Sequence, residues 1–167
     1  TVFDRQNKIV ADLERANFQV FDNNARQEIR FFSRQTDLPL RVGLLMDTSN
    51  SIRERLRFEQ DAAVDFLFNV IRRDKDDQAF LMSVDDQPEV EQAFTPDLQQ
   101  LRDAIRRQRA GGGTALYDAI YRACEEVLKA PPPAVARGDA AELRRVLVVI
   151  SDGEDNVSRH TREEALE

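Results

Sequence analysis

Residues 40–46 read Leu-Arg-Val-Gly-Leu-Leu-Met and run directly into Asp-Thr-Ser-Asn-Ser at residues 47–51. The first of these stretches is almost continuously apolar, which is typical of a β-strand buried on both faces. Two later stretches have the same character, at residues 78–84 (QAFLMSV) and 145–150 (RVLVVI). Between them, apolar side chains recur at helical spacing, over residues 53–72 and in segments that begin at residues 96 and 114. Strands that alternate with helices predict an α/β fold around a mainly parallel sheet.

The rest of the chain adds an edge to this sheet and a separate segment before it. Residues 89–94 alternate polar and apolar side chains, which predicts a half-exposed edge strand after the turn at residues 85–88. Residues 1–37 predict short strands and turns, including a hairpin that pairs residues 18–21 with 28–32 around Asp22-Asn23-Asn24. We therefore expect an N-terminal β-hairpin segment at 1–37 and an α/β domain at 38–167.

Composition excludes several classes of function. The 167 residues carry a formal net charge of −7, and a nucleic-acid-binding surface would need clustered, uncompensated cations. The arginines that do cluster, around residues 53–57 and 102–109, alternate with acids and predict a solvated surface. No apolar stretch approaches the roughly 20 residues of a membrane-spanning helix, so we expect no direct membrane insertion. A lone cysteine, Cys124, excludes an internal disulfide.

Polar loops follow two of the predicted buried strands. Asp47, Ser49 and Ser51 follow the first strand, and Asp152 follows the last within Ser-Asp-Gly. Ligands bind at the carboxyl ends of strands in open α/β sheets, so segments distant in sequence can meet there. A third polar loop, Gly-Gly-Gly-Thr, ends at Thr114. Each piece alone is also compatible with a helix cap or an ordinary turn, but their joint occurrence in this order favours one site.

The side chains of these loops suit a hard divalent cation. Carboxylate and hydroxyl oxygens are ligands for Mg²⁺, Mn²⁺ or Ca²⁺ and suit zinc poorly. Mg²⁺ keeps several waters, so a small set of oxygen ligands with one open position suits it best. Neutral hydroxyls as direct ligands leave much of the ion's charge available to a carboxylate from outside. The residues thus predict a metal site at which a carboxylate of another molecule can bind.

From residue 40 onward the chain resembles the von Willebrand factor type A (VWA) domain, a Rossmann-like three-layer sandwich. In that family an Asp-x-Ser-x-Ser loop, a distal Thr and a distal Asp form the metal-ion-dependent adhesion site (MIDAS). The matching residues here are Asp47, Ser49, Ser51, Thr114 and Asp152. The resemblance implies that Ser49, Ser51 and, in one state, Thr114 contact the metal directly. It implies that the two aspartates act largely through water, and that an Asp or Glu of a protein partner completes the coordination.

Two departures from the family accompany this resemblance. Asn50 stands where the family most often has Gly, and we expect Asn to tolerate left-handed backbone there. The family's domain normally ends with two further strands and a helix, so we expect a sheet that is short at its C-terminal end.

Residues 1–37 resemble the β segment that precedes such domains in a group of bacterial proteins, many of them exported. The sequence does not determine the cellular compartment of the protein, and only that likeness favours an extracytoplasmic or secreted location.

The residues predict a non-enzymatic, metal-dependent protein-binding module. An alternative with the same fold is an assembly subunit that works with an ATPase machine, which the sequence does not separate from adhesion. A Mg²⁺-dependent phosphoryl-transfer enzyme also places an Asp after its first strand, but it typically needs a second acid two residues later. Ser49 stands there instead. His160, the single histidine, is expected to be a solvated loop residue, because no nucleophile is placed to use it.

Overall fold

The computed structural model describes residues 2–32, 38–129 and 143–167. The chain divides into two compact units, Thr1–Asp37 and Leu38–Glu167. Residues 130–141, where three prolines and Gly138 predict an exposed connection, lie outside the described residues. Over the part that is described, no helix is both long enough and apolar enough to cross a membrane.

The N-terminal unit contains the predicted hairpin in a tighter form. Strand β1 (Val20–Asp22) pairs antiparallel with β2 (Ala25–Gln27). Asn23 and Asn24 form the turn, with φ of 48° and 64°. Two residues with positive φ suffice for a hairpin connection, so pairing begins at once on both sides. The second strand predicted at 28–32 was therefore placed too late. A 3₁₀ turn, η1 (Arg15–Asn17), precedes the hairpin.

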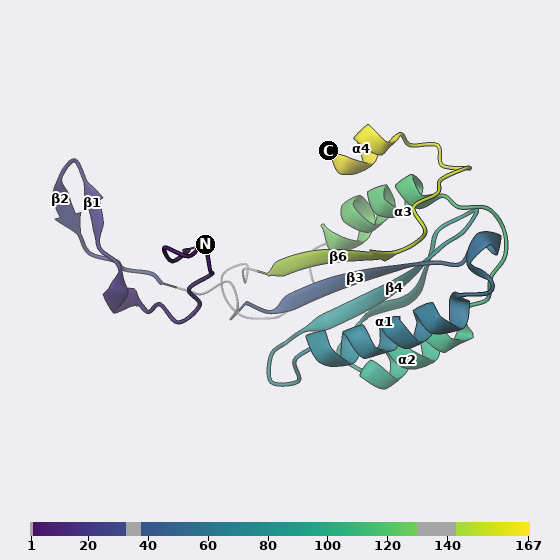
Figure 1. The fold of residues 1–167 in the computed structure, drawn as a ribbon, viewed down its shortest axis with the longest axis horizontal. Helices are drawn as coiled ribbons and strands as arrows, with labels where there is room; N and C mark the ends of the chain where they lie inside the picture. The colour runs from purple at the N-terminus through teal and green to yellow at the C-terminus, as the bar shows by residue number, and fades with distance from the viewer. Residues whose placement is uncertain (1, 33–37, 130–142) are drawn as a thin grey trace. The chain divides into compact units, whose positions relative to one another are not determined.

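The second unit is built on a four-stranded sheet in the order β5-β4-β3-β6 (Figure 1). Its strands are β3 (Leu40–Asp47), β4 (Gln78–Val84), β5 (Glu89–Thr95) and β6 (Arg144–Ile150). Strand β3 pairs parallel with both β4 and β6, and β5 pairs antiparallel with β4. The predicted mainly parallel sheet with one antiparallel edge strand is confirmed.

Strand β6 is more exposed than its sequence predicts. The run at residues 145–150 is the most apolar in the chain and predicts a strand buried on both faces. The structure instead places β6 at the edge of the described sheet, where none of its residues is fully buried and Val149 is 40% exposed. The hydrophobicity of a strand indicates that it prefers burial, whereas the number of strands beside it depends on the order of strands in the sheet.

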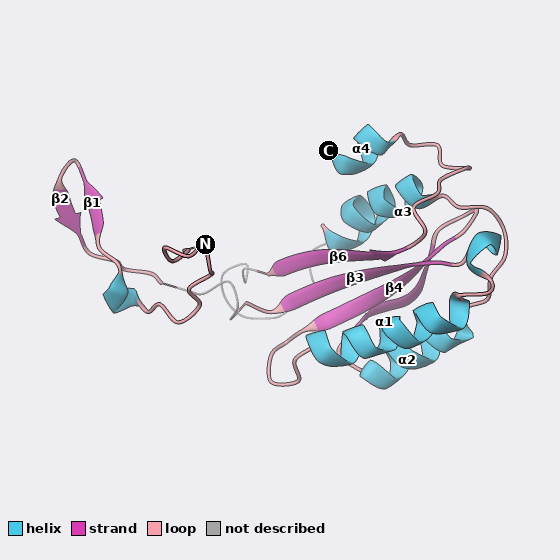
Figure 2. Cartoon of the chain, in the orientation of Figure 1, coloured by secondary structure: helices cyan, strands magenta, loops and turns pink. Residues whose placement is uncertain are grey.

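Helices cover both faces of the sheet (Figure 2). On one face lie α1 (Leu56–Val70) and α2 (Leu98–Arg107). On the other lies α3 (Leu116–Arg122), which continues as the π-helical segment η4 (Ala123–Leu128); α4 (Arg162–Leu166) packs against α3 on the side away from the sheet. These three layers confirm the predicted Rossmann-like α/β architecture. The helix expected over residues 53–72 starts later, because a 3₁₀ turn, η3 (Asn50–Ile52), precedes it.

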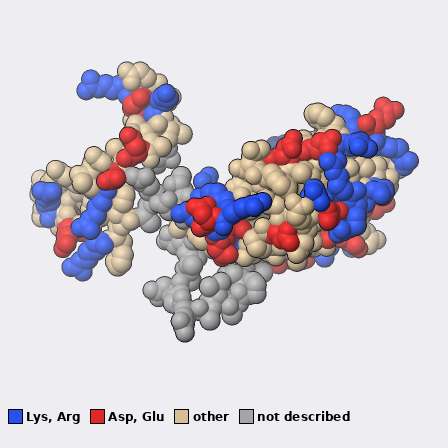
Figure 3. All heavy atoms as spheres, turned by 90° about the horizontal axis from the view of Figure 1, so that it is seen from below, with Lys and Arg blue, Asp and Glu red and all other residues tan. Residues whose placement is uncertain are grey.

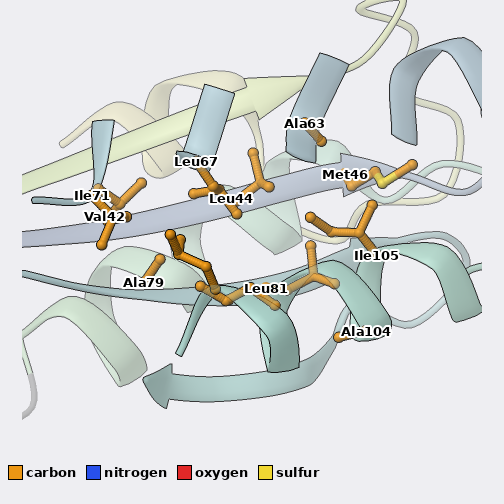
Figure 4. Close-up of a cluster of buried hydrophobic side chains, with 12 residues drawn as sticks. Val42, Leu44, Met46, Ala63, Leu67, Ile71, Ala79, Leu81, Ala104 and Ile105 are labelled. Atoms are coloured by element: carbon orange, nitrogen blue, oxygen red, sulfur yellow. The ribbon is translucent and has the colours of Figure 1, made fainter. Parts of the chain in front are cut away.

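Alternate residues of the central strands fill two separate cores. Val42, Leu44 and Met46 of β3 pack with Leu67 and other residues under α1 and α2 (Figure 4). Their neighbour Leu45 belongs to the opposite core, under α3 and η4. Because side chains alternate across a strand, one continuous apolar run serves both layers. The burial on both faces makes β3 the centre of the domain.

Gly43 lies where the second core approaches β3 most closely. A Cβ on this residue would lie 2.6 Å from Phe80 Cζ and 2.8 Å from Leu147 Cδ1. Phe80 is fully buried and belongs to a close-packed cluster, so it has little room to move.

We predict that Gly43→Ala lowers the free energy of unfolding by about 1–3 kcal/mol, because one added methyl group overpacks this core. Urea unfolding followed by circular dichroism measures the change. Gly111→Ala is the matched control, since no heavy atom lies within 4 Å of the Cβ it would add. Equal stability of the two variants would show that the core at Gly43 adapts without cost.

A buried carboxylate joins the amino ends of β3 and β4. Asp77 is fully buried and accepts hydrogen bonds from Leu40 N at 2.8 Å and from Arg72 Nε at 2.7 Å, among others. Burial by itself would raise the pKa of Asp77. The hydrogen bonds from the side chain and backbone of Arg72 and from Leu40 outweigh it and hold that pKa below its ordinary value.

We predict that Asp77→Asn destabilises the domain by about 2–3 kcal/mol at neutral pH, because the replacement loses the charge that pairs with Arg72. A lowered pKa in the folded state means that ionised Asp77 stabilises the fold above the unfolded-state pKa of about 3.9. This contribution disappears as the pH falls through the lower folded-state pKa. The stability difference between wild type and variant should therefore shrink below about pH 4, as urea unfolding across pH would show.

Asp74→Asn is the control for this experiment, because Asp74 is exposed and lies in the same loop. A pH-independent difference between wild type and Asp77→Asn would contradict the proposed charge pairing.

Candidate metal centre

The polar loops predicted to meet do so at the carboxyl edge of the sheet. Met46 of β3 is paired with Ile150 of β6, so the residues that follow these strands lie side by side. The glycine-rich loop is bound to the first loop by its backbone: Gly111 N donates to Thr48 O at 2.7 Å, and Asn50 N donates to Gly112 O at 3.1 Å. Parallel pairing and these two backbone hydrogen bonds thus gather three segments at one edge.

Four of the five predicted site residues are joined by hydrogen bonds. Ser49 Oγ lies 2.9 Å from Ser51 Oγ, and Ser51 Oγ donates to Asp152 Oδ2 at 2.9 Å. Asp47 Oδ1 accepts from Ser49 N at 2.8 Å, and Asp47 Oδ2 accepts from Ser151 Oγ at 2.8 Å. Asp47 and Ser49 are buried, whereas Ser51 and Asp152 are exposed. The network therefore reaches from the sheet to the surface.

Thr114, the fifth residue, is held close by through its backbone. It is 2% exposed, its N–H donates to Asn156 Oδ1 at 2.9 Å, and its carbonyl accepts from Asn156 N at 3.0 Å. Within the described residues, no hydrogen bond joins the Thr114 hydroxyl to the other four side chains. The loop after β6 thus holds Thr114 at the same edge while its hydroxyl is not part of the network.

The alternative interpretation as simple helix caps is wrong for both loops. The residue that caps α1 is Arg55, and α3 is capped at Ala115, neither with a side-chain cap. The first-turn amides of α3 are satisfied from a distant segment instead. Tyr117 N donates to Asp155 Oδ2 at 3.0 Å, and Asp118 N donates to Ser158 Oγ at 3.1 Å.

Asn50 needs no left-handed backbone, although it replaces the family's usual Gly. It is absent from the described residues with positive φ and begins η3. Its Oδ1 accepts a hydrogen bond from Arg53 Nη2 at 2.8 Å. The loop therefore keeps its course by starting a 3₁₀ turn.

His160 lies in a loop with its side chain 36% exposed, and it is also held against α3, which the sequence did not predict. Its Nδ1 lies 2.7 Å from Asp118 Oδ1, and its ring stacks on Tyr121 with 4.0 Å between centroids. Burial would raise the pKa of Asp118, but hydrogen bonds from His160 and from Arg159 N lower it. Residues 155–160 are thus fastened along α3, which holds the preceding Asp152 near the first loop.

Two charged residues near the network were not identified from the sequence. Arg55 Nη2 lies 3.8 Å from Asp152 Oδ2, and the Arg55 side chain is 62% exposed. Glu59, on the first turn of α1, has a raised pKa because it is partly buried and because the charges of Asp47 and Asp152 lie near it; Arg55 opposes this shift. Glu59 lies three residues after Leu56 and four before Ala63, so helical spacing places it on the apolar side of α1, and a charged residue there was the signal that the sequence offered.

The oxygen atoms gathered here can bind a hard cation only if serine hydroxyls act as ligands together with the carboxylates. Among the described residues, no group of three or more His, Cys, Asp or Glu side chains converges as metal ligands. The two aspartates with the hydroxyls of Ser49 and Ser51 offer oxygen atoms alone, as Mg²⁺, Mn²⁺ or Ca²⁺ requires. The residues present therefore fit a cation that keeps part of its water shell.

The clustered arginines lie on a mixed-charge surface, as predicted. Figure 3 shows Lys and Arg side chains gathered, with acids among them, at the end of this unit that lies to the right in Figure 1. Arg106 pairs with Asp61 at 2.5 Å and Arg102 with Asp103 at 3.1 Å.

A family model for the von Willebrand factor type A domain matches residues 42–154, which is more than half of the chain. The chain belongs to the von Willebrand factor type A domain family. The match covers the first loop, the glycine-rich loop and Asp152 of this VWA domain, and the resemblance inferred from sequence is confirmed. No curated protein matches the chain.

Solved structures share the fold of this VWA domain at low sequence identity. The vWF domain of the type V pili tip protein Mfa5 from Porphyromonas gingivalis is 21% identical, with a TM-score of 0.58 over 71% of this chain and 39% of that chain. Proximal thread matrix protein 1 from the mussel byssus is 17% identical, with a TM-score of 0.60 over 77% and 32%. A further structure of that mussel protein has a zinc-occupied MIDAS motif (18% identity, TM-score 0.53, 72% and 30%). This chain spans well under half the length of these relatives.

We predict that Asp155→Ala destabilises the VWA domain by about 1–2 kcal/mol, because Tyr117 N and Ser158 Oγ both lose their acceptor. Thermal unfolding measures the loss. Glu154→Ala is the control, since Glu154 is the exposed neighbour of Asp155 in the same loop. A variant as stable as this control would contradict the capping of α3 by Asp155.

Proposed function

We propose that this VWA domain is a non-enzymatic, divalent-metal-dependent protein-binding module. One observation carries the proposal: side chains from loops about a hundred residues apart, Asp47, Ser49, Ser51 and Asp152, form one hydrogen-bonded oxygen cluster at the carboxyl edge of the sheet. Such an edge is where ligands bind in open α/β sheets. Family members are often metal-dependent interaction modules, and a mussel relative has metal at the equivalent motif.

The metal of this proposal is Mg²⁺, with Mn²⁺ or Ca²⁺ as possible replacements. The hydroxyls of Ser49 and Ser51 would be direct ligands, and Asp47 and Asp152 would act mainly through bound water. Thr114 would contribute its hydroxyl in one state of the site. When bound, the ion supplies a partly neutralised positive charge with one open position. An Asp or Glu of the partner protein would occupy that position.

The partner is proposed to be a protein, and the site to be non-catalytic. Among the described residues, no hydrogen bond joins the histidine to a serine hydroxyl of this site: His160 Nδ1 lies 2.7 Å from Asp118 Oδ1, and Ser151 Oγ donates to Asp47 Oδ2. The relative from Porphyromonas gingivalis is a pilus tip protein, which favours an extracytoplasmic location for this chain as part of the proposal.

We expect Mg²⁺ to raise the unfolding temperature of the protein after treatment with a chelator, because an ion that binds only the folded state stabilises it. A concentration one hundred times the dissociation constant would add about 2.7 kcal/mol. Asp47→Asn should remove most of this stabilisation, because it weakens the charge that holds the ion's water. Differential scanning calorimetry across a Mg²⁺ titration measures both effects.

Asp65→Asn is the matched control, since it removes one negative charge from the exposed side of α1. The control should respond to Mg²⁺ as wild type does. A wild-type unfolding temperature that is independent of Mg²⁺, Mn²⁺ and Ca²⁺ would refute the metal-dependent function.

A further inference from the structure

Glu59 carries an unusual oxygen atom. Its Oε2 is buried and has no hydrogen-bond partner, and it is the one such side-chain atom found in residues 2–32, 38–129 and 143–167. The residue lies on the first turn of α1, where its N–H donates to Arg55 O at 3.0 Å. A buried carboxylate oxygen without a donor is unfavourable, so its persistence calls for a physical explanation.

The other carboxylates of the cluster have their donors already. Asp47 accepts from Ser49 N and Ser151 Oγ, one at each oxygen. Asp152 accepts from Ser51 Oγ at one oxygen and from Glu154 N at the other. Glu59 lies one helical turn after Arg55, whose Nη2 is 3.8 Å from Asp152 Oδ2, and the negative charges of Asp47 and Asp152 raise the pKa of Glu59. It is therefore the carboxylate beside the cluster that still has an unused acceptor.

We propose that Glu59 is a further residue of the metal site and accepts a hydrogen bond from a water molecule bound to the cation. This inference rests on the proposed metal-dependent function. The carboxylates of the described chain do not converge as direct ligands, so Glu59 acts across a water. Mg²⁺ retains several waters, and each is a strong hydrogen-bond donor. One of them supplies the donor that Glu59 Oε2 lacks.

Glu59 also adds negative charge around the cation. Asp47, Asp152 and Glu59 bring three carboxylates near the site, against the single guanidinium of the largely exposed Arg55. With hydroxyls as the direct ligands, outer carboxylates provide most of the neutralising charge. Residues that orient bound groups from behind the ligands typically contribute 10- to 100-fold in metal affinity. Glu59 is thus a positioning residue of the site.

The test measures Mg²⁺ affinity by isothermal titration calorimetry on chelator-treated protein. Glu59→Gln keeps the shape and removes the charge, and Glu59→Met also removes the acceptor. We expect about a 10-fold weaker affinity for Glu59→Gln and at least as large a loss for Glu59→Met. Glu54→Gln is the matched control, because Glu54 is an exposed glutamate five residues earlier; its affinity should stay within about twofold of wild type.

Unfolding temperature in excess chelator separates a metal role from a structural one. Without metal the buried Oε2 is unsatisfied, so Glu59→Met should unfold at the wild-type temperature or higher. A purely structural Glu59 would instead lower that temperature in both variants.

Three outcomes overturn the inference: both Glu59 variants bind Mg²⁺ like wild type, Glu54→Gln loses as much affinity as Glu59→Gln, or both Glu59 variants unfold earlier in chelator. Failure of wild type itself to bind Mg²⁺ would refute the proposed function instead. Wild-type binding with unaffected Glu59 variants refutes this inference alone.

Discussion

Parallel pairing of β3 with β6 is the constraint on which the candidate site depends. The two strands run in the same direction with Met46 opposite Ile150, so their following residues emerge at one edge. Asp47 and Asp152 could not share a hydrogen-bonded cluster if either strand were reversed. The pairing is stabilised by apolar burial on both faces of β3, up to Met46, the residue directly before Asp47. The core thus sets the geometry, and the loops supply the chemistry.

Polar groups at this edge stabilise one another through long-range hydrogen bonds. The amides of α3 are satisfied by Asp155 and Ser158, which lie about 40 residues later in the chain. This arrangement ties the loop after β6 to the helix that follows the glycine-rich loop. At η3 and α1, which follow the first loop, the hydroxyls of Ser49 and Ser51 make no capping hydrogen bond. Because these two hydroxyls do not cap a helix, they remain available to a cation. Their positions depend on the packing of the whole fold.

Sequence patterns predicted much of the architecture because they record local preferences. Continuous apolar runs identified β3 and β4, alternation identified the exposed β5, and Asp97 marked the start of α2, where its side chain accepts from Gln99 N. The same reasoning failed for β6, because an apolar strand says nothing about how many neighbours it has. It also did not predict the contacts of His160, since Tyr121 and Asp118 lie 39 and 42 residues away.

The amino-acid sequence by itself determined the α/β class, the order of strands and helices along the chain, and the set of oxygen-bearing residues at the strand ends. Periodicity and residue type suffice for these, because they depend on neighbours within a few positions. Only the tertiary structure decided that Ser51 Oγ and Asp152 Oδ2 lie 2.9 Å apart, that α3 is capped by Asp155, and that Glu59 Oε2 is buried without a hydrogen-bond partner. Those facts arise from the packing of distant segments. Helical spacing places Glu59 on the apolar side of α1, but it does not say which groups that side chain meets there.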